Sequence, residues 1–68
     1  MKVINHTVQA HGSNLVFSYD FDNGYSANWS KSKSPFGNDI FFVYTKKGNF
    51  ASQIQAQKAK QAIDQYNS

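Results

Sequence analysis

The 68-residue chain contains no cysteine, arginine or glutamate, and only one proline. Without cysteine it can form no disulfide and offers no thiolate for a zinc site. No apolar run approaches the roughly 18 residues that cross a bilayer as a helix, and residues 1–5 lack the core of a signal peptide. We therefore expect a cytoplasmic protein without a membrane partner.

The length of the chain limits the size of its core. Sixty-eight residues are expected to form one domain, residues 1–68, and so small a domain buries only roughly 60% of its unfolded surface. The chain has six Phe, four Tyr and one Trp, enough for a compact aromatic core. Self-association is another way for a small domain to gain stability, so a homodimer stays open.

The clearest pattern is a pair of alternating runs. Apolar residues occupy every second position from Leu15 to Phe21 and again from Tyr25 to Trp29, which places them on one face of each strand. Asn23-Gly24 lies between the runs and is typical of a tight hairpin turn with two residues of positive φ. This hairpin is expected to organise the core.

The remaining elements complete an α+β fold. Strands are expected over about residues 2–10, 15–21, 25–30 and 39–45, and a helix over about 52–66. Residues 31–38 contain Pro and Gly and are expected to form a mobile loop. The fold class predicted is a four-stranded antiparallel meander sheet with one C-terminal helix packed on one face.

Individual strands and the helix carry further signals. Alternation in the first strand predicts Ile4, His6, Val8 and Ala10 on one face, with Val3, Asn5, Thr7 and Gln9 on the other. The run from Ile40 to Tyr44 does not alternate, as in a strand that is buried on both faces or has one face committed to a partner. Ser52 and Gln55 have the spacing of a capping box, and an alanine-rich stripe follows at helical spacing.

Groups that support catalysis are few. The acidic residues are four aspartates, two of them beside the hairpin turn, and the two histidines have no third ligand at metal-binding spacing. The chain contains neither a Gly-x-Ser-x-Gly motif nor a glycine-rich phosphate loop. We expect a non-enzymatic protein with no cofactor, no metal site and no catalytic residues.

Positive charge is concentrated in the second half of the chain. Residues 31–60 hold six lysines against Asp39 alone, a local net charge of +5 within a chain of net charge +3. A basic half favours an acidic partner such as nucleic acid, while a solvated lysine surface would give the same count. Aromatic residues of the last strand, framed by lysines, could stack bases while the lysines hold phosphates. The candidate binding residues are Lys31, Lys33, Lys46, Lys47, Asn28, Ser30, Phe41 and Tyr44.

The junction from Gly48 to Ala56 resembles the strand-to-helix junction of two DNA-binding families. These are the apetala-type plant transcription factor domains and the arm-type N-terminal domains of tyrosine integrases. Phe50, Ser52, Gln55 and Ala56 match the family offsets. The resemblance covers under half of the chain and implies recognition of the major groove by the sheet face away from the helix. The families read DNA largely through arginine and tryptophan, and this chain has no arginine.

Three functional classes follow from these observations, and the third of them is a purely structural component of a larger assembly. The first is a nucleic-acid-binding module that uses the lysines and the aromatic residues of the sheet. The alternative is a protein inhibitor from a phage or mobile element, of the anti-CRISPR or a similar host-takeover type. Such an inhibitor would bind a host protein through its sheet face or by strand addition at a sheet edge.

Overall fold

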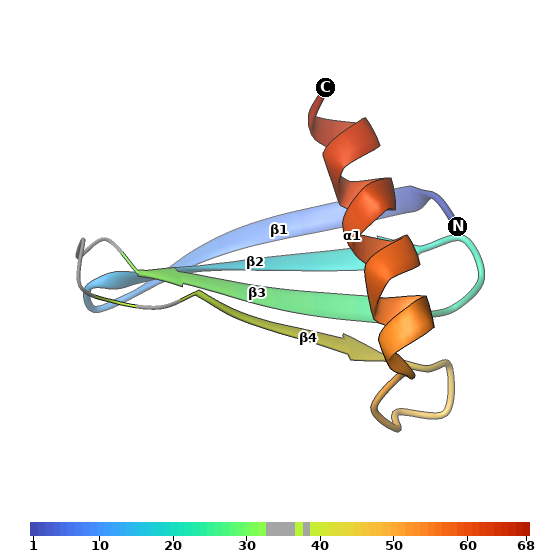
Figure 1. Ribbon diagram of the computed structural model, residues 1–68. Helices are drawn as coiled ribbons and strands as arrows, with labels where there is room; N and C mark the ends of the chain where they lie inside the picture. Colours follow the sequence, from blue (N-terminus) through green and yellow to red (C-terminus); the bar gives the residue numbers. More distant parts are fainter. Residues whose placement is uncertain (33–36, 38) are drawn as a thin grey trace.

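The computed structural model describes residues 1–32, 37 and 39–68, and it has the predicted α+β architecture. Four antiparallel strands follow one another in the order β1-β2-β3-β4, and the helix α1 lies on one face of the sheet (Figure 1). The bounds are β1 Val3–His11, β2 Asn14–Phe21, β3 Ser26–Ser32, β4 Ile40–Tyr44 and α1 Gln53–Asn67. Each observed bound lies within two residues of the expected one. The predicted loop 31–38 begins later, since Lys31 and Ser32 belong to β3, and most of it lies outside the described residues.

The turn between β2 and β3 differs from the expected two-residue turn. Phe21 N–H donates to the Tyr25 carbonyl (2.9 Å), and Gly24 N–H donates to the Phe21 carbonyl (3.1 Å). Three residues therefore form the loop, and of these only Gly24 has positive φ (88°). Asn23 contributes its side chain instead, because its Oδ1 accepts from Tyr25 N–H at 3.1 Å. The prediction of two positive-φ residues is wrong: a three-residue loop needs only one.

Replacing Gly24 by alanine is expected to lower the free energy of unfolding by about 1–2 kcal/mol, because a Cβ destabilises the left-handed conformation. The added Cβ would also lie 3.0 Å from Cγ of Lys46, so that side chain must move. Gly48→Ala is the matched control, since Gly48 has the same φ and no atom within 4 Å of the added Cβ. Urea denaturation of both variants separates the two contributions. Equal stability of Gly24→Ala and the original chain would contradict the turn geometry.

A β-bulge changes the facing of the first strand. The β1–β2 register pairs Val3 with Phe21 and Asn5 with Asp20, so one extra residue of β1 lies between these pairs. Val3 therefore lies on the same face as His6 and packs against the core, whereas Ile4 is exposed. Strict alternation had placed Ile4 on that face and Val3 on the other. The prediction is wrong at these two residues because a bulge shifts the side-chain period by one.

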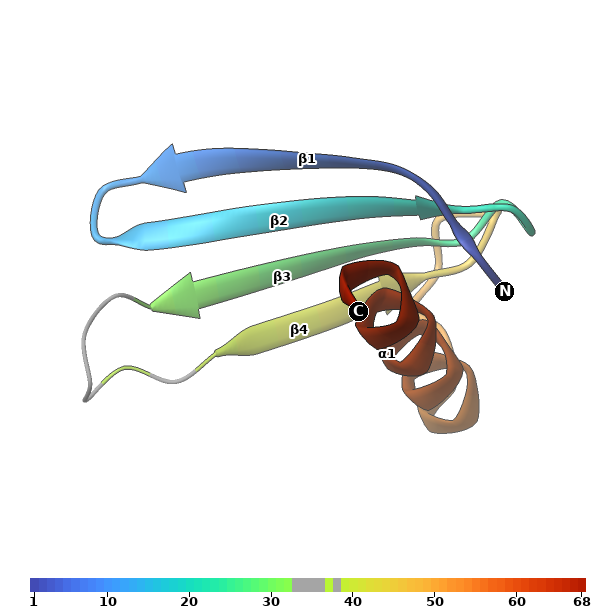
Figure 2. The same ribbon diagram turned by 90° about the horizontal axis from the view of Figure 1, so that it is seen from above.

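The core lies between α1 and one end of the sheet. Its buried sheet residues come from β2, β3 and β4, and its buried helix residues are small or aliphatic: Tyr19, Phe21, Ala27, Val43, Ala59, Ala62 and Ile63. The alanines let the helix backbone approach the sheet closely. Figure 2 shows that α1 covers one end of the sheet, while the opposite ends of the strands extend past it.

The helix begins as the sequence predicts. Ser52 is the N-cap, and its hydroxyl accepts from Gln55 N–H at 3.3 Å. Near the other end, the Tyr66 hydroxyl shares a hydrogen bond with His6 Nδ1 (2.8 Å), and this contact ties the last turn of α1 to β1. No helix among the described residues has the length and apolar character that crossing a membrane requires.

The face away from the helix, called here the outer face, has two parts. On β2 and β3 it is polar except for Val16, and the Ser18 hydroxyl donates to Asn28 Oδ1 at 3.0 Å. On β4 it is apolar, and the side chains of this stripe are Ile40, Phe42 and Tyr44, joined by Phe50 from the turn before α1. Phe41 and Val43 face the helix. Of the two interpretations of β4, burial on both faces is therefore wrong, since one face is largely exposed.

Candidate nucleic-acid interface

A row of aromatic side chains crosses the helix side of the sheet beside α1. Phe17 of β2 is paired with Trp29 of β3, and Trp29 with Phe41 of β4. Cross-strand partners share a face, so the three rings form a line, called here the aromatic row. The Trp29 and Phe41 rings meet edge to face with their centroids 5.1 Å apart. All three side chains are half-buried, because the helix covers the neighbouring row of residues and not this one.

Two lysines converge on the aromatic row from different elements. Lys31 is two residues beyond Trp29 on the same face of β3, and its Nζ lies 4.5 Å from the Trp29 ring centroid and 5.1 Å from that of Phe17. Lys60 reaches from α1, and its Nζ lies 5.4 Å from the Trp29 ring. At these distances both ammonium groups are attracted to the negative face of the indole. The result is an aromatic surface with two positive charges over its central ring, Trp29.

Neither ammonium group is neutralised by the rest of the described chain. Among residues 1–32, 37 and 39–68, neither Lys31 nor Lys60 forms an ion pair with a carboxylate. The indole N–H of Trp29 is also buried without a hydrogen-bond acceptor in that part of the chain. An anion bound beside the Trp29 ring would therefore reduce the repulsion between the two ammonium groups, whereas the buried indole N–H is out of its reach.

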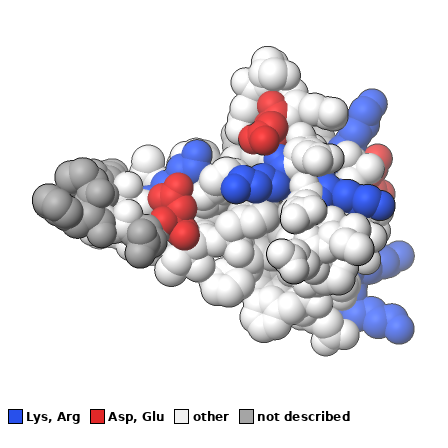
Figure 3. All heavy atoms as spheres, in the orientation of Figure 1, with Lys and Arg blue, Asp and Glu red and all other residues white. Residues whose placement is uncertain are grey.

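The predicted site residues do not form one patch. Lys31 and Phe41 share the helix side of the sheet, whereas Asn28, Ser30 and Tyr44 lie on the outer face. Lys46 and Lys47 belong to the turn after β4, at the opposite end of the sheet from Lys31. Lys33 lies outside the described residues. In Figure 3, accordingly, the lysine side chains are spread over the helix side of the molecule.

Sequence reasoning missed three residues of this surface. Phe17 and Trp29 were assigned to the core because they alternate with polar residues, and Lys60 was not among the candidate binding residues. The structure leaves both rings half-buried and brings Lys60 onto Trp29. A sequence pattern does not show how much of a sheet a helix will cover. That coverage decides whether an aromatic side chain on the helix side is buried in the core or stays at the surface.

The outer face lacks the charge needed for the recognition mode that the family resemblance implies. Its described residues on the four strands include Asp20 and no lysine, since Lys31 belongs to the helix side. Phosphate contacts supply most of the affinity of DNA-binding proteins and require basic side chains. Charge therefore makes the helix side the better candidate of the two for a nucleic-acid interface.

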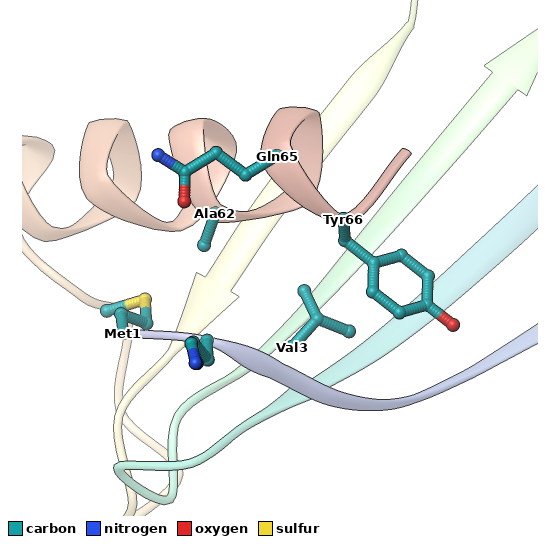
Figure 4. A pocket seen from close by; sticks show the side chains of 6 residues that line it. Met1, Val3, Ala62, Gln65 and Tyr66 are labelled. Carbon is teal, nitrogen blue, oxygen red and sulfur yellow. The ribbon is translucent and has the colours of Figure 1, made fainter. Parts of the chain in front are cut away.

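A hollow on the described surface lies away from the aromatic row. Its volume is about 310 Å³, and it lies between the N-terminus and the last turns of α1 (Figure 4). Its lining is Met1, Lys2, Val3, Ala62, Gln65 and Tyr66. It is open to solvent and contains no carboxylate. No group of three or more His or Asp side chains that could hold a metal occurs in the described chain.

Comparisons with known proteins give no relative from which a function could be inferred, so the function must be inferred from the geometry described above. No protein-family model, no curated protein and no solved structure matches the chain.

Proposed function

We propose that the protein is a non-enzymatic module that binds nucleic acid through the aromatic row, with Lys31 and Lys60 as its phosphate contacts. The observation that carries the proposal is the convergence on the Trp29 ring, at 4.5 and 5.4 Å, of two ammonium groups that form no ion pair with the described part of the chain. Aromatic rings that stack bases beside lysines that hold phosphates are the usual composition of surfaces that bind nucleic acid without strong sequence preference.

The geometry favours single-stranded over duplex nucleic acid. The rings of the aromatic row are half-buried beside the helix, and stacking on their exposed parts requires a base that is not already stacked in a duplex. The chain has no arginine for bidentate contacts with guanine. We therefore expect weak sequence preference and strong dependence on salt.

The single tryptophan provides a direct test, because Trp29 is the only indole in the chain and lies in the aromatic row. Titration with a mixed-sequence single strand of DNA or RNA is expected to quench Trp29 emission as bases stack on the ring. If Lys31 and Lys60 contact one phosphate each, the logarithm of the binding constant should fall with the logarithm of salt with a slope of about −1.4.

The duplex of the same sequence serves as the control ligand. It is expected to bind more weakly and to leave Trp29 emission nearly unchanged, since its bases remain stacked. Unchanged emission with single strands at low salt, where a protein of net charge +3 attracts polyanions most strongly, would contradict the proposal.

A second candidate function rests on the apolar stripe of the outer face. Phe42 and Phe50 are both exposed, with ring centroids 5.8 Å apart. Exposed apolar patches of this kind are typical of protein-binding surfaces. The alternative function, a phage-type inhibitor, requires such a surface for binding its host protein. Phe42→Ser with Phe50→Ser should abolish capture of such a protein and leave Trp29 quenching by nucleic acid unchanged.

A further inference from the structure

The two edges of the sheet differ in how they are protected. Beyond β4, Tyr44 forms an antiparallel bridge with Phe50, so residues 49–51 cover part of that edge. At the other edge β1 is a nine-residue strand with no Asp, Glu, Lys, Arg or Pro along its length. Natural sheets usually block an exposed edge with such residues, with a bulge or with a covering segment. On β1 the only such device is the bulge at its N-terminal end.

The backbone of β1 presents hydrogen-bonding groups to the open side. Phe21 N–H donates to Tyr25, so Phe21 and every second residue before it direct their backbone groups toward β3. The alternate residues of β2 direct theirs toward β1, where their partners are Asn5, Thr7 and Gln9. The N–H and C=O groups of the intervening β1 residues therefore point away from the sheet: His6, Val8 and Ala10.

The same alternation can be checked on β4. It places the backbone groups of Val43 and Thr45 on the open side, and there the Val43 carbonyl accepts from Ala51 N–H (2.9 Å) while Thr45 N–H donates to Asn49 (2.7 Å). The alternating direction of the backbone groups is therefore confirmed on β4, where residues 49–51 bond to the open side of the strand. On β1 no described segment of the chain takes that position.

We infer that a second copy of this chain pairs with the open edge of β1, antiparallel, with Val8 opposite Val8 across a two-fold axis. This register brings His6, Val8 and Ala10 of one chain against Ala10, Val8 and His6 of the other, and gives about six backbone hydrogen bonds. It stays clear of the bulge between Val3 and Asn5, and on the helix side it places Ala10 of the second copy beside His6, whose ring contacts the last turn of α1.

The side chains on both faces are compatible with this pairing. On the helix side Val8, which is 48% exposed, meets Val8 of the second copy, and on the outer face Thr7 meets Gln9. No charged residue lies opposite a like charge, because the strand has none. Cross-strand pairs of matching character stabilise a sheet, and like charges destabilise it. A foreign peptide would need to supply this match, whereas a second copy supplies it by symmetry.

The dimer would also extend the surface described above. Val8 is the cross-strand partner of Phe17, so it continues the aromatic row to the edge of the sheet. Pairing at Val8 joins the rows of two chains into one line across eight strands, with the Trp29 residues roughly 24 Å apart at a strand spacing of about 4.8 Å. The inference about pairing does not depend on nucleic-acid binding, and it is tested without nucleic acid.

Sedimentation velocity of the unmodified chain over about 5–500 μM is the first experiment. The expected result is a shift from the 7.7 kDa monomer to a species of twice that mass as the concentration rises. Val8→Lys should stay monomeric over this range, because two ammonium groups would face each other at the two-fold axis. Ile40→Lys, at a similarly exposed residue of β4 (51%), should still dimerise. A monomer at every concentration would overturn the inference, and so would loss of the dimer in Ile40→Lys alone.

Disulfide formation tests the register, because the chain has no cysteine of its own. A hydrogen-bonded antiparallel pair has Cα atoms about 5.5 Å apart, within the Cα range of a disulfide, and its Cβ atoms must approach by about 1 Å for the bond to close. Val8→Cys is therefore expected to form a covalent dimer on mild oxidation, at least tenfold faster than Ile40→Cys. Both residues are about half exposed, so unequal access does not explain such a difference. Equal rates for the two variants would overturn the pairing at Val8.

Discussion

Replacing Ile63 by alanine is expected to lower the free energy of unfolding by about 3 kcal/mol and to leave much of the protein unfolded at 37 °C. Ile63 has no exposed surface and is the largest buried side chain that the helix contributes to the core. Truncation of a buried isoleucine to alanine costs about 2–5 kcal/mol. A chain of 68 residues has a total stability of only about 3–10 kcal/mol, so this one change removes a large fraction of it.

The same helix provides a matched control. Ile54→Ala removes the same atoms from a side chain that is 67% exposed in the first turn of α1, and it is expected to change stability by less than about 0.5 kcal/mol. Helix propensity cancels in the comparison, since both variants exchange isoleucine for alanine within α1. Urea denaturation followed by far-ultraviolet circular dichroism measures both. Equal losses would show that α1 does not dock on the sheet through Ile63.

The sequence was sufficient to predict the elements of the fold. Strict alternation from Leu15 to Phe21 identified β2, and Ser52 marked the start of α1 because a hydroxyl three residues before a free backbone N–H is a strong local signal. Such signals depend on neighbours in the chain. The bulge between Val3 and Asn5 was not predictable in this way, since it becomes apparent only when β1 is paired with β2.

The candidate site was harder to predict because it depends on how α1 crosses the sheet. A helix of 15 residues is about 22 Å long, yet it runs across the strands and covers only one end of them (Figure 2). Trp29 has the inward facing of a core residue, but it lies at the flank of the helix, where Lys60 reaches it. The separation of Lys31 from Lys46 likewise follows from the antiparallel course of β3 and β4, which places the ends of the two strands at opposite ends of the sheet.

Reversing the charge of Lys31 and Lys60 together, by Lys31→Glu with Lys60→Glu, is expected to weaken single-strand binding by at least about 100-fold at low salt. The change removes the two proposed phosphate contacts and places two carboxylates beside the aromatic row, where they would repel the phosphates of any strand that stacks there. Fluorescence anisotropy with a labelled single strand measures the loss, and circular dichroism checks that the sheet and helix are retained.

Lys46→Glu with Lys47→Glu controls for total charge. Each pair of substitutions takes the net charge from +3 to −1, because every lysine-to-glutamate change removes two charges. Long-range attraction is therefore reduced equally in the two variants, and only the position of the charge differs. We expect the control to lose no more than about tenfold, since Lys46 and Lys47 lie in the turn after β4 and long-range effects are screened beyond roughly 10 Å in 0.1 M salt. Equal losses in both variants would mean that binding depends on overall charge and would remove the aromatic row as the site.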